Sequence, residues 1–417
     1  MRKKWFSILA FGIAVCLFAG CGAQKSGEDV GSSYFEPAES ISSLDSSAVS
    51  QSRPEQADVM KCRTPEPEKI PLEGPGVQIE QGYDLEAFAD GNIYTRGKNG
   101  DGTTMLYENG EAVGEYPLDL GFAGDLVIGD LYFSLVGIAQ EDETMNMCLT
   151  VYNLRDKTRK IAYSAPLTNY RSYLYPLGDS AVMFSYNGIE DGEKYEFTGV
   201  YDFKEDTCKI VSKHPEGVWD DAKTTGQEIT AVCADGERIY FAKEQRINGE
   251  VAVFLTCLDR DGQILYEDEV KLLSQRWRHE TNIQWIDVAG DYIFVSYYTA
   301  GSALPTNELK PVVLKRTAEG YAVLPLDSGV RFSRRISSGL VGGRYLLFAA
   351  ALDDNGAYPA DFIAFDVIEE DYRLIRFDLK EEATFRTFAD KQGNLLTFYV
   401  NDQRKRYFFC VDAGDWL

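Results

Sequence analysis

Gly290-Asp291-Tyr292-Ile293-Phe294 is one copy of a short motif that recurs seven times along this chain and predicts its fold. Each copy is a turn glycine, in most cases beside an aspartate or an asparagine, followed by a strand rich in Tyr, Phe, Leu and Ile. Glycine suits such turns because it accepts a positive φ without steric cost. The turn glycines of the seven copies are Gly91, Gly129, Gly178, Gly236, Gly290, Gly343 and Gly393.

The successive glycines are 38, 49, 58, 54, 53 and 50 residues apart. A period of this length that contains only strands and turns indicates a β-propeller. One period shows the order of strands and turns within a predicted blade. The strand Val253–Leu258 is followed by the turn Asp259–Gly262 and by a further strand, Gln263–Tyr266. A strand such as Ile229–Cys233 precedes each key glycine. Four antiparallel strands per period are therefore expected.

The two ends of the repeat region complement each other. The last period stops at Leu417, after three strands, and leaves no room for a fourth. The alternating segment Gly76–Gln81 can supply the missing strand, which would remove an exposed sheet edge. The sequence thus predicts an all-β, seven-bladed β-propeller over residues 76–417, with an N-terminal strand closing the last blade. Six and eight blades are the alternatives.

The first 21 residues have the pattern of a secretory signal. Met-Arg-Lys-Lys is followed by an apolar run, Trp5–Ala19, which is shorter than the about 20 apolar residues of a spanning helix. The run ends in Leu17-Phe18-Ala19-Gly20-Cys21, which resembles the lipobox of bacterial lipoproteins. The resemblance implies cleavage after residue 20 and a diacylglycerol on Cys21. Phe18 departs from the pattern, in which a smaller aliphatic residue is commoner.

Residues 21–75 have the composition of a flexible linker, rich in Ser, Glu and Pro and poor in large apolar side chains. The expected organisation is a signal peptide over residues 1–20, a lipidated cysteine and linker over 21–75, and a propeller over 76–417. The protein would then lie on the extracytoplasmic face of the bacterial cell membrane, anchored through Cys21. The glycine-led repeats over residues 77–417 also resemble those of lipoprotein propellers with TolB-like and PQQ-like repeats, a likeness that unrelated functions share.

Charge and residue usage exclude several kinds of function. The 417 residues carry a formal net charge of −24, which disfavours nucleic acid as a partner. The chain has only two histidines, and neither stands in an H-x-x-x-H or H-E-x-x-H motif. It has no C-x-x-C pair and no G-x-S-x-G nucleophile motif. We therefore predict no catalytic residue, no metal and no cofactor, and the missing motifs favour a binding role over an enzyme.

One face of a propeller carries the connections between blades together with the loops between second and third strands. The two longest connections, Ser212–Glu228 and Leu272–Thr281, contain both histidines and two of the five tryptophans. Exposed Trp and Tyr beside Arg are typical of binding surfaces. The candidate ligand-binding residues on this face are Trp219, Asp220, Trp277, Arg278, His279 and Tyr298. The alternative is that the tryptophans cap blade edges.

Three arginines form a second candidate group. Arg171, Arg335 and Arg386 each stand seven residues before a turn glycine (Gly178, Gly342 and Gly393), at the start of a predicted innermost strand. They could converge on an anionic group near the channel mouth, or pair with acidic neighbours.

Two functions remain open at this point. The first is a lipid-anchored binding or scaffold protein that recognises an envelope or extracellular protein, peptide or glycan through the loop-rich face. The alternative is an extracellular polysaccharide-active hydrolase or lyase with its site at the channel mouth.

Overall fold

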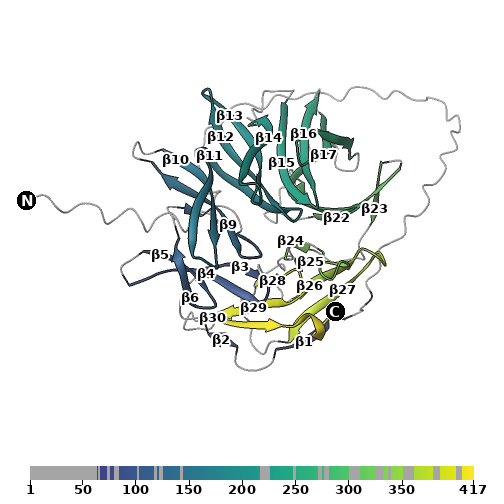
Figure 1. Cartoon of the computed structure of the whole chain (residues 1–417). Coiled ribbons are helices and arrows are strands. Elements are labelled where there is room, and N and C mark those ends of the chain that lie inside the picture. Colours follow the sequence, from purple (N-terminus) through teal and green to yellow (C-terminus); the bar gives the residue numbers. More distant parts are fainter. Residues whose placement is uncertain are drawn as a thin grey trace, which may run out of the picture. The chain divides into compact units, whose positions relative to one another are not determined.

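A computed structural model gives the structure of the chain, and Figure 1 shows its strands as successive sheets. The structure describes residues 63, 66–72, 76–78, 84–100, 103–116, 120–121, 125–140, 144–216, 226–247, 250–270, 275–276, 281–299, 310–318, 320–324, 332–336, 340–350, 361–378, 386–400 and 406–417. The chain divides into two compact units, Met1–Arg53 and Pro54–Leu417, and every described residue belongs to the second. Apart from a 3₁₀ turn, η1 (Ala413–Asp415), all regular elements in the described ranges are strands. The predicted all-β class is confirmed.

The sheets are antiparallel meanders that follow chain order. The first is β3 (Asp84–Ala89), β4 (Asn92–Lys98), β5 (Thr104–Glu108) and β6 (Glu111–Glu115). A later one is β15 (Gly226–Asp235), β16 (Arg238–Ile247), β17 (Glu250–Asp259) and β18 (Ile264–Glu269), with β19 (Gln275–Arg276) also paired to β17. The next is β20 (Thr281–Ala289), β21 (Tyr292–Thr299), β22 (Lys310–Thr317) and β23 (Gly320–Leu324). Then comes β24 (Phe332–Arg335), β25 (Tyr345–Ala350), β26 (Asp361–Asp366) and β27 (Asp371–Asp378). The last is β28 (Arg386–Ala389), β29 (Leu395–Val400) and β30 (Arg406–Val411).

An eight-stranded sheet between the first and the later meanders contains two of these units. Its strands are β7 (Leu120–Gly121), β8 (Leu126–Ile128), β9 (Leu131–Ala139), β10 (Met145–Asn153), β11 (Thr158–Leu177), β12 (Ala181–Glu190), β13 (Glu193–Asp202) and β14 (Thr207–Pro215). β11 is 20 residues long, and residues 158–166 pair with β10 while residues 167–177 pair with β12. One continuous strand thus ends one meander and begins the next.

Turn aspartates join neighbouring meanders. The side chain of Asp235 accepts a hydrogen bond of 3.1 Å from the backbone N–H of Gly290, in the turn of the following meander. Asp390, in the last meander, accepts an equivalent bond of 3.1 Å from the N–H of Gly91 in the first. The last and first meanders are therefore joined in the same way as two consecutive ones.

The apolar core is divided into clusters, each packed between two neighbouring meanders. Phe294 and Phe348, from successive meanders, lie with ring centroids 4.6 Å apart, and both are almost fully buried. Phe88 of β3 belongs to one cluster with Leu396 and Phe398 of β29. Burial of such aromatic side chains dominates core energetics, so each interface between meanders stabilises the fold. The first and last meanders share one of these interfaces.

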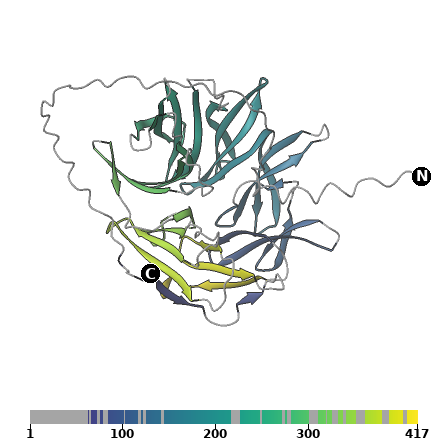
Figure 2. The ribbon, with the colours of Figure 1, turned by 180° about the vertical axis from the view of Figure 1, so that it is seen from behind.

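The N-terminal segment covers two sheet edges. β2 (Val77–Gln78) pairs antiparallel with β30, as expected for the strand that completes the last meander. β1 (Glu68–Pro71) pairs in parallel with β27, which was not expected. Figures 1 and 2 both place β1 beside the strands of the last two meanders. The linker predicted over residues 21–75 therefore differs from the structure in its last part, because Glu68–Pro71 belongs to a sheet. No helix within the described ranges has the length and apolarity needed to cross a membrane.

Candidate functional site

The structure places few side chains of the predicted loop-face site. Cys21, Trp219, Asp220, Trp277, Arg278 and His279 lie outside the described residues. Tyr298 lies in β21, where it is paired with Asn282. Arg171, Arg335 and Arg386 lie in β11, β24 and β28, each of which begins a meander as predicted. The side chains of these four residues are not among those described, so their roles stay predictions.

His214 differs from its predicted place in a loop. β14 extends to Pro215, so the first residues of the predicted connection Ser212–Glu228 form an edge strand. The His214 ring lies 2.7 Å from the Ser212 hydroxyl through Nε2 and packs edge-on against Phe241 at 5.7 Å. Burial lowers the pKa of His214, and the nearby Lys243 lowers it further. The ring is thus a neutral packing element between two meanders.

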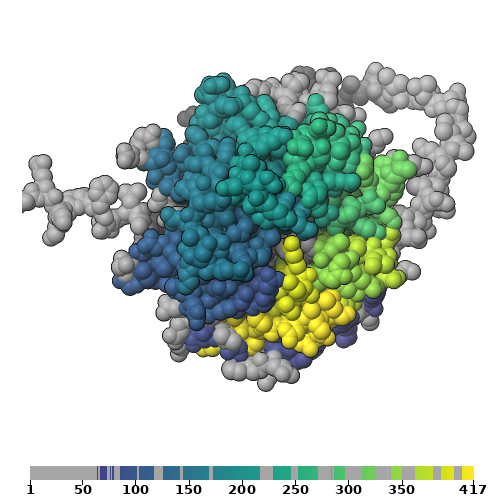
Figure 3. Space-filling model, in the orientation of Figure 1, coloured from purple at the N-terminus to yellow at the C-terminus, as the bar shows by residue number. Residues whose placement is uncertain are grey.

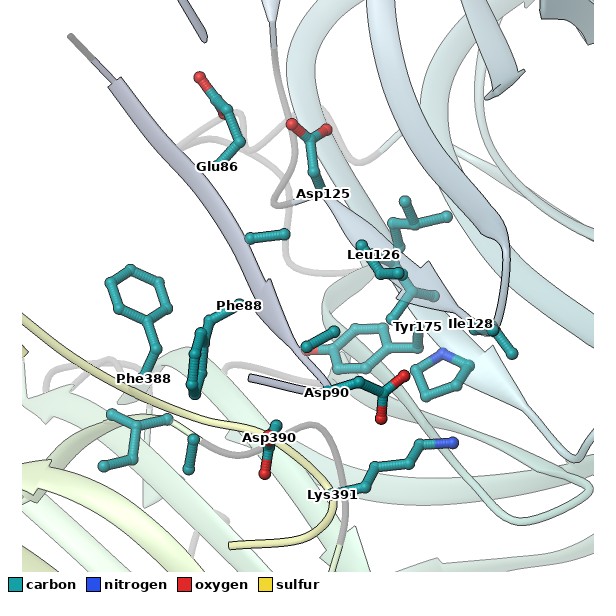
Figure 4. A pocket seen from close by; sticks show the side chains of 18 of the residues that line it. Glu86, Phe88, Asp90, Asp125, Leu126, Ile128, Tyr175, Phe388, Asp390 and Lys391 are labelled. Carbon is teal, nitrogen blue, oxygen red and sulfur yellow. The ribbon is translucent and has the colours of Figure 1, made fainter. Parts of the chain in front are cut away.

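A pocket of about 400 Å³ lies where the first strands of several meanders converge. β3, β8, β11 and β28 contribute lining residues, and Figure 4 shows the pocket from close by. Glu86 and Asp125 stand at one end, and Asp90, Asp390 and Lys391 stand at the other. The lining also includes residues of the turns that follow β3, β8 and β28, such as Asp90, Gly129 and Lys391.

Two carboxyl groups, those of Glu86 and Asp125, lie at one end of the pocket. Glu86 comes from β3 and makes an ion pair of 3.0 Å with Nε of Arg96, from the neighbouring strand β4. Asp125 directly precedes β8 and lines the same end of the pocket as Glu86. The two carboxyl groups therefore give this end of the pocket an acidic character.

Tyrosine hydroxyls enclose the Asp125 carboxylate. Tyr116 donates to it at 3.2 Å, and Tyr132, whose side chain is fully buried, donates as well. Burial raises the pKa of Asp125, against hydrogen bonds from Ser134 and Tyr132 that lower it. Burial, followed by the charge of Asp125, raises the pKa of both tyrosines, which keeps them as neutral donors.

Ring packing holds these hydroxyls in place. Tyr116 stacks on Tyr152 with centroids 6.1 Å apart and meets Tyr132 edge-on at 6.4 Å. Arg96 lies 5.6 Å above the Tyr116 ring, and the Tyr152 hydroxyl donates to the Glu115 carbonyl at 2.6 Å. Offset and edge-to-face pairs of this kind add about 0.5–1.5 kcal/mol each beyond burial. The donors around Asp125 are therefore preorganised.

Two further pocket carboxylates, Asp390 and Asp287, accept hydrogen bonds from the backbone. Asp390 is almost fully buried and accepts hydrogen bonds from the backbone N–H groups of Gln392, Gly393 and Asn394 at 2.9–3.0 Å. Asp287 is also buried and accepts a bond of 2.9 Å from the N–H of Val288. These two aspartates shape turns and strand ends. They add to the negative charge of Glu86, Asp90 and Asp125, and Lys391 is the one lysine among the lining residues.

The sequence analysis did not identify the pocket residues, although their positions relative to the turn glycines could have indicated them. Glu86, Asp125 and Asp287 stand three to five residues before the turn glycines Gly91, Gly129 and Gly290. Positions in an inner strand are usually apolar when the strand is buried on both faces. An acidic residue recurring there points to a polar cavity. Among the described residues, no group of three or more His, Cys, Asp or Glu side chains is arranged to hold a metal ion.

No protein-family model matches the chain, and no curated protein matches it in sequence. Solved structures are similar at low identity. The β-propeller domain of the Trilobed protease from Pyrococcus furiosus is 8% identical, with 71% of this chain and 82% of that chain covered and a TM-score of 0.45. A polysaccharide lyase described as an ulvan lyase is 8% identical, with 82% and 94% covered and a TM-score of 0.46. An oligogalacturonate lyase from Vibrio parahaemolyticus is 10% identical, with 81% and 91% covered and a TM-score of 0.43. At these values the similarities assign no family and no activity.

Proposed function

We propose that this chain is a lipid-anchored binding protein on the extracytoplasmic face of the bacterial cell membrane, and that its ligand enters the acidic pocket. The observation that carries the ligand site is the presence of two acidic side chains, Glu86 and Asp125, at one end of the pocket. Carboxylates that line a partly desolvated cavity attract positive charge. The proposed ligand is therefore an amine-bearing group of an envelope or extracellular glycan or peptide.

The proposed fold is a seven-bladed β-propeller. Its support is that each meander counts as one blade, with β11 shared between two, and that the last blade takes β2 as its outer strand. The bond from Gly91 to Asp390 and the shared cluster around Phe88 support closure of the first blade on the last. In a closed propeller the pocket lies at the central channel, which explains why it is lined by first strands.

The charge of the pocket disfavours an acidic polysaccharide. A lyase that removes a proton beside a uronate carboxylate has to stabilise added negative charge. The pocket lining has five acidic residues and only one lysine, Lys391. The acidic residues are Glu86, Asp90, Asp125, Asp287 and Asp390. The polysaccharide-active enzyme remains the second candidate, with a site on other residues.

The proposed anchor is a lipid on Cys21, followed by a tether that ends where Arg63 enters the fold. A flexible chain of about 40 residues reaches on the order of 35–40 Å. The loop-face residues, with Trp219 and Trp277 foremost, are proposed to contact a larger partner that carries the ligand group.

Calorimetry with two matched oligosaccharides tests the proposed ligand class. Glucosamine oligomers carry an amine at each ring, and in their N-acetylated counterparts a neutral acetamide replaces each charged amine. We expect the amine form to bind at least tenfold more tightly, and oligogalacturonate not to bind. Asp125→Asn should weaken binding of the amine form by about 10- to 100-fold, since a hydrogen bond to a charged group is worth about 1.5–3 kcal/mol.

Asp130→Asn is the control, because Asp130 is exposed, makes an ion pair of 2.7 Å with Arg155, and is not among the residues that line the pocket. Equal binding of galacturonate and glucosamine oligomers would contradict the proposed ligand class. Release of reducing ends from either oligomer would favour the enzyme instead.

A further inference from the structure

The outer edge of β27 is filled by a strand from far away in the sequence. Glu68, Lys69, Ile70 and Pro71 of β1 lie opposite Ile375, Arg376, Phe377 and Asp378, in parallel. The backbone N–H of Arg63 adds a bond of 2.9 Å to the carbonyl of Tyr372. An extended segment that adds to a sheet edge through backbone bonds is a recurring mode of peptide recognition. In Figure 3 the purple N-terminal residues lie against the yellow and green C-terminal ones.

Side chains of the segment are recognised individually. The Arg63 guanidinium lies 3.0 Å from a carboxylate oxygen of Asp366 and also bonds to Asp371. Glu68 pairs with Arg373 at 3.3 Å. Ile70 is 5% exposed and belongs to one cluster with residues of β27, including Ile375 and Phe377. The contacts define a pattern, Arg-x4-Glu-x-Ile.

The side chains that bind the segment are held in place by contacts with other parts of the chain. Asp366 is bonded by Nε of Arg344 at 2.7 Å and by the backbone N–H groups of Ile368 and Glu369 at 3.0 and 3.2 Å. Arg373 donates to the Trp416 carbonyl at 3.1 Å. The site is therefore preorganised, which lowers the entropic cost of binding.

Pro71 is the last residue of β1, and β1 is the outermost strand of its sheet. A proline there has no N–H to offer to a ladder. The segment thus covers the edge of β27 and ends in a residue that disfavours the addition of another strand to the sheet.

We infer that the β27 edge, with Asp366, Asp371 and Arg373, is a binding site for an extended Arg-x4-Glu-x-Ile peptide, which the chain fills with its own residues 63–70. The segment is joined to β3 by a short stretch, so its effective concentration at the edge is on the order of millimolar. A peptide of the same sequence at micromolar concentration therefore binds only when the chain's own segment is weakened.

The test uses full-length protein and a fluorescent peptide of residues 61–72 in which serine replaces Cys62. Fluorescence polarisation should show no binding to the unaltered chain and saturable binding to the Arg63→Ala/Ile70→Asp chain. The same peptide with Arg63→Ala should bind at least tenfold more weakly. The Arg155→Ala chain, which loses an exposed ion pair to Asp130, is the matched control and should not bind.

Hydrogen exchange over residues 375–378 reports the state of the edge. In the double variant these amides should exchange faster, and the peptide should restore their protection. If the double variant does not fold, the Arg63→Ala chain replaces it, with weaker but measurable peptide binding expected. A folded variant with an exchanging edge that the peptide neither binds nor protects would overturn the inference. Unchanged protection, or equal binding of a scrambled peptide, would overturn it too.

Discussion

Gly262 is the turn residue whose replacement tests the packing between meanders most directly. It lies in the β17–β18 turn at a φ of +88°, and a Cβ built on it would lie 2.3 Å from the carbonyl oxygen of Val211 in the neighbouring meander. The turn is fixed to that meander, because Arg260 donates to the Ser180 hydroxyl at 2.9 Å and Lys209 pairs with Asp261 at 3.2 Å. Gly262→Ala therefore pushes a backbone carbonyl that has little freedom to move.

Gly192 is the matched control, since its φ is +81° and nothing lies within 4 Å of its built Cβ. A side chain at positive φ costs about 1–2 kcal/mol, which applies to both glycines. Overpacking adds about 1–3 kcal/mol, which applies only to Gly262. We expect Gly262→Ala to lower the free energy of unfolding by about 2–5 kcal/mol, and Gly192→Ala by about 1–2 kcal/mol.

Urea unfolding followed by tryptophan fluorescence measures both variants, and the slope of free energy against urea should stay unchanged. A difference between the two variants smaller than about 0.5 kcal/mol would refute the reasoning, because it would mean that the meanders separate at no cost at this contact.

Three further predictions concern the site and the anchor. Asp125→Asn should raise the free energy of unfolding at neutral pH and lose this gain below about pH 4. Burial raises the pKa of Asp125, so the stability of the unaltered chain falls as pH rises through that pKa. Asn does not titrate, so the variant escapes this loss. Urea unfolding from pH 3.5 to 8 checks this, and a gain that is the same at every pH would contradict it. Trp219→Ala with Trp277→Ala should abolish crosslinking to the partner on intact cells without changing the urea midpoint; unchanged crosslinking would remove these residues from the site. Cys21→Ala should move the protein out of the membrane fraction and abolish incorporation of a fatty-acid probe, and persistent incorporation would count against the lipidation site.

Turn positions were predictable because they depend on local geometry. Six turn glycines of the repeat, among them Gly91, Gly236 and Gly290, do adopt a positive φ, as do Gly342 and Gly343 side by side in the remaining turn. The pairing of Val77–Gln78 with β30 was also predictable, since the last period lacked a strand. Both inferences need only a count of strands and the conformational freedom of glycine.

Other features could not be predicted because they depend on which edges and side chains meet. β1 has a short, Pro- and Glu-rich sequence typical of a linker, and only the free edge of β27 makes it a strand. His214 has an ordinary position for a loop residue, yet it packs on Phe241 because two meanders meet there. Local propensity is too weak to decide either case.

The all-β class, the period of the strands and the places of the turns could be predicted from the sequence, because they depend on glycine φ and on apolar side chains close together in the chain. The shared pocket of Glu86 and Asp125, and the bond from Arg63 to Asp371, 308 residues away, could be seen only in the folded chain. Burial and charge pairing act between surfaces that packing brings together. The pKa of Asp125 is raised because packing buries its carboxyl group among residues from distant parts of the sequence.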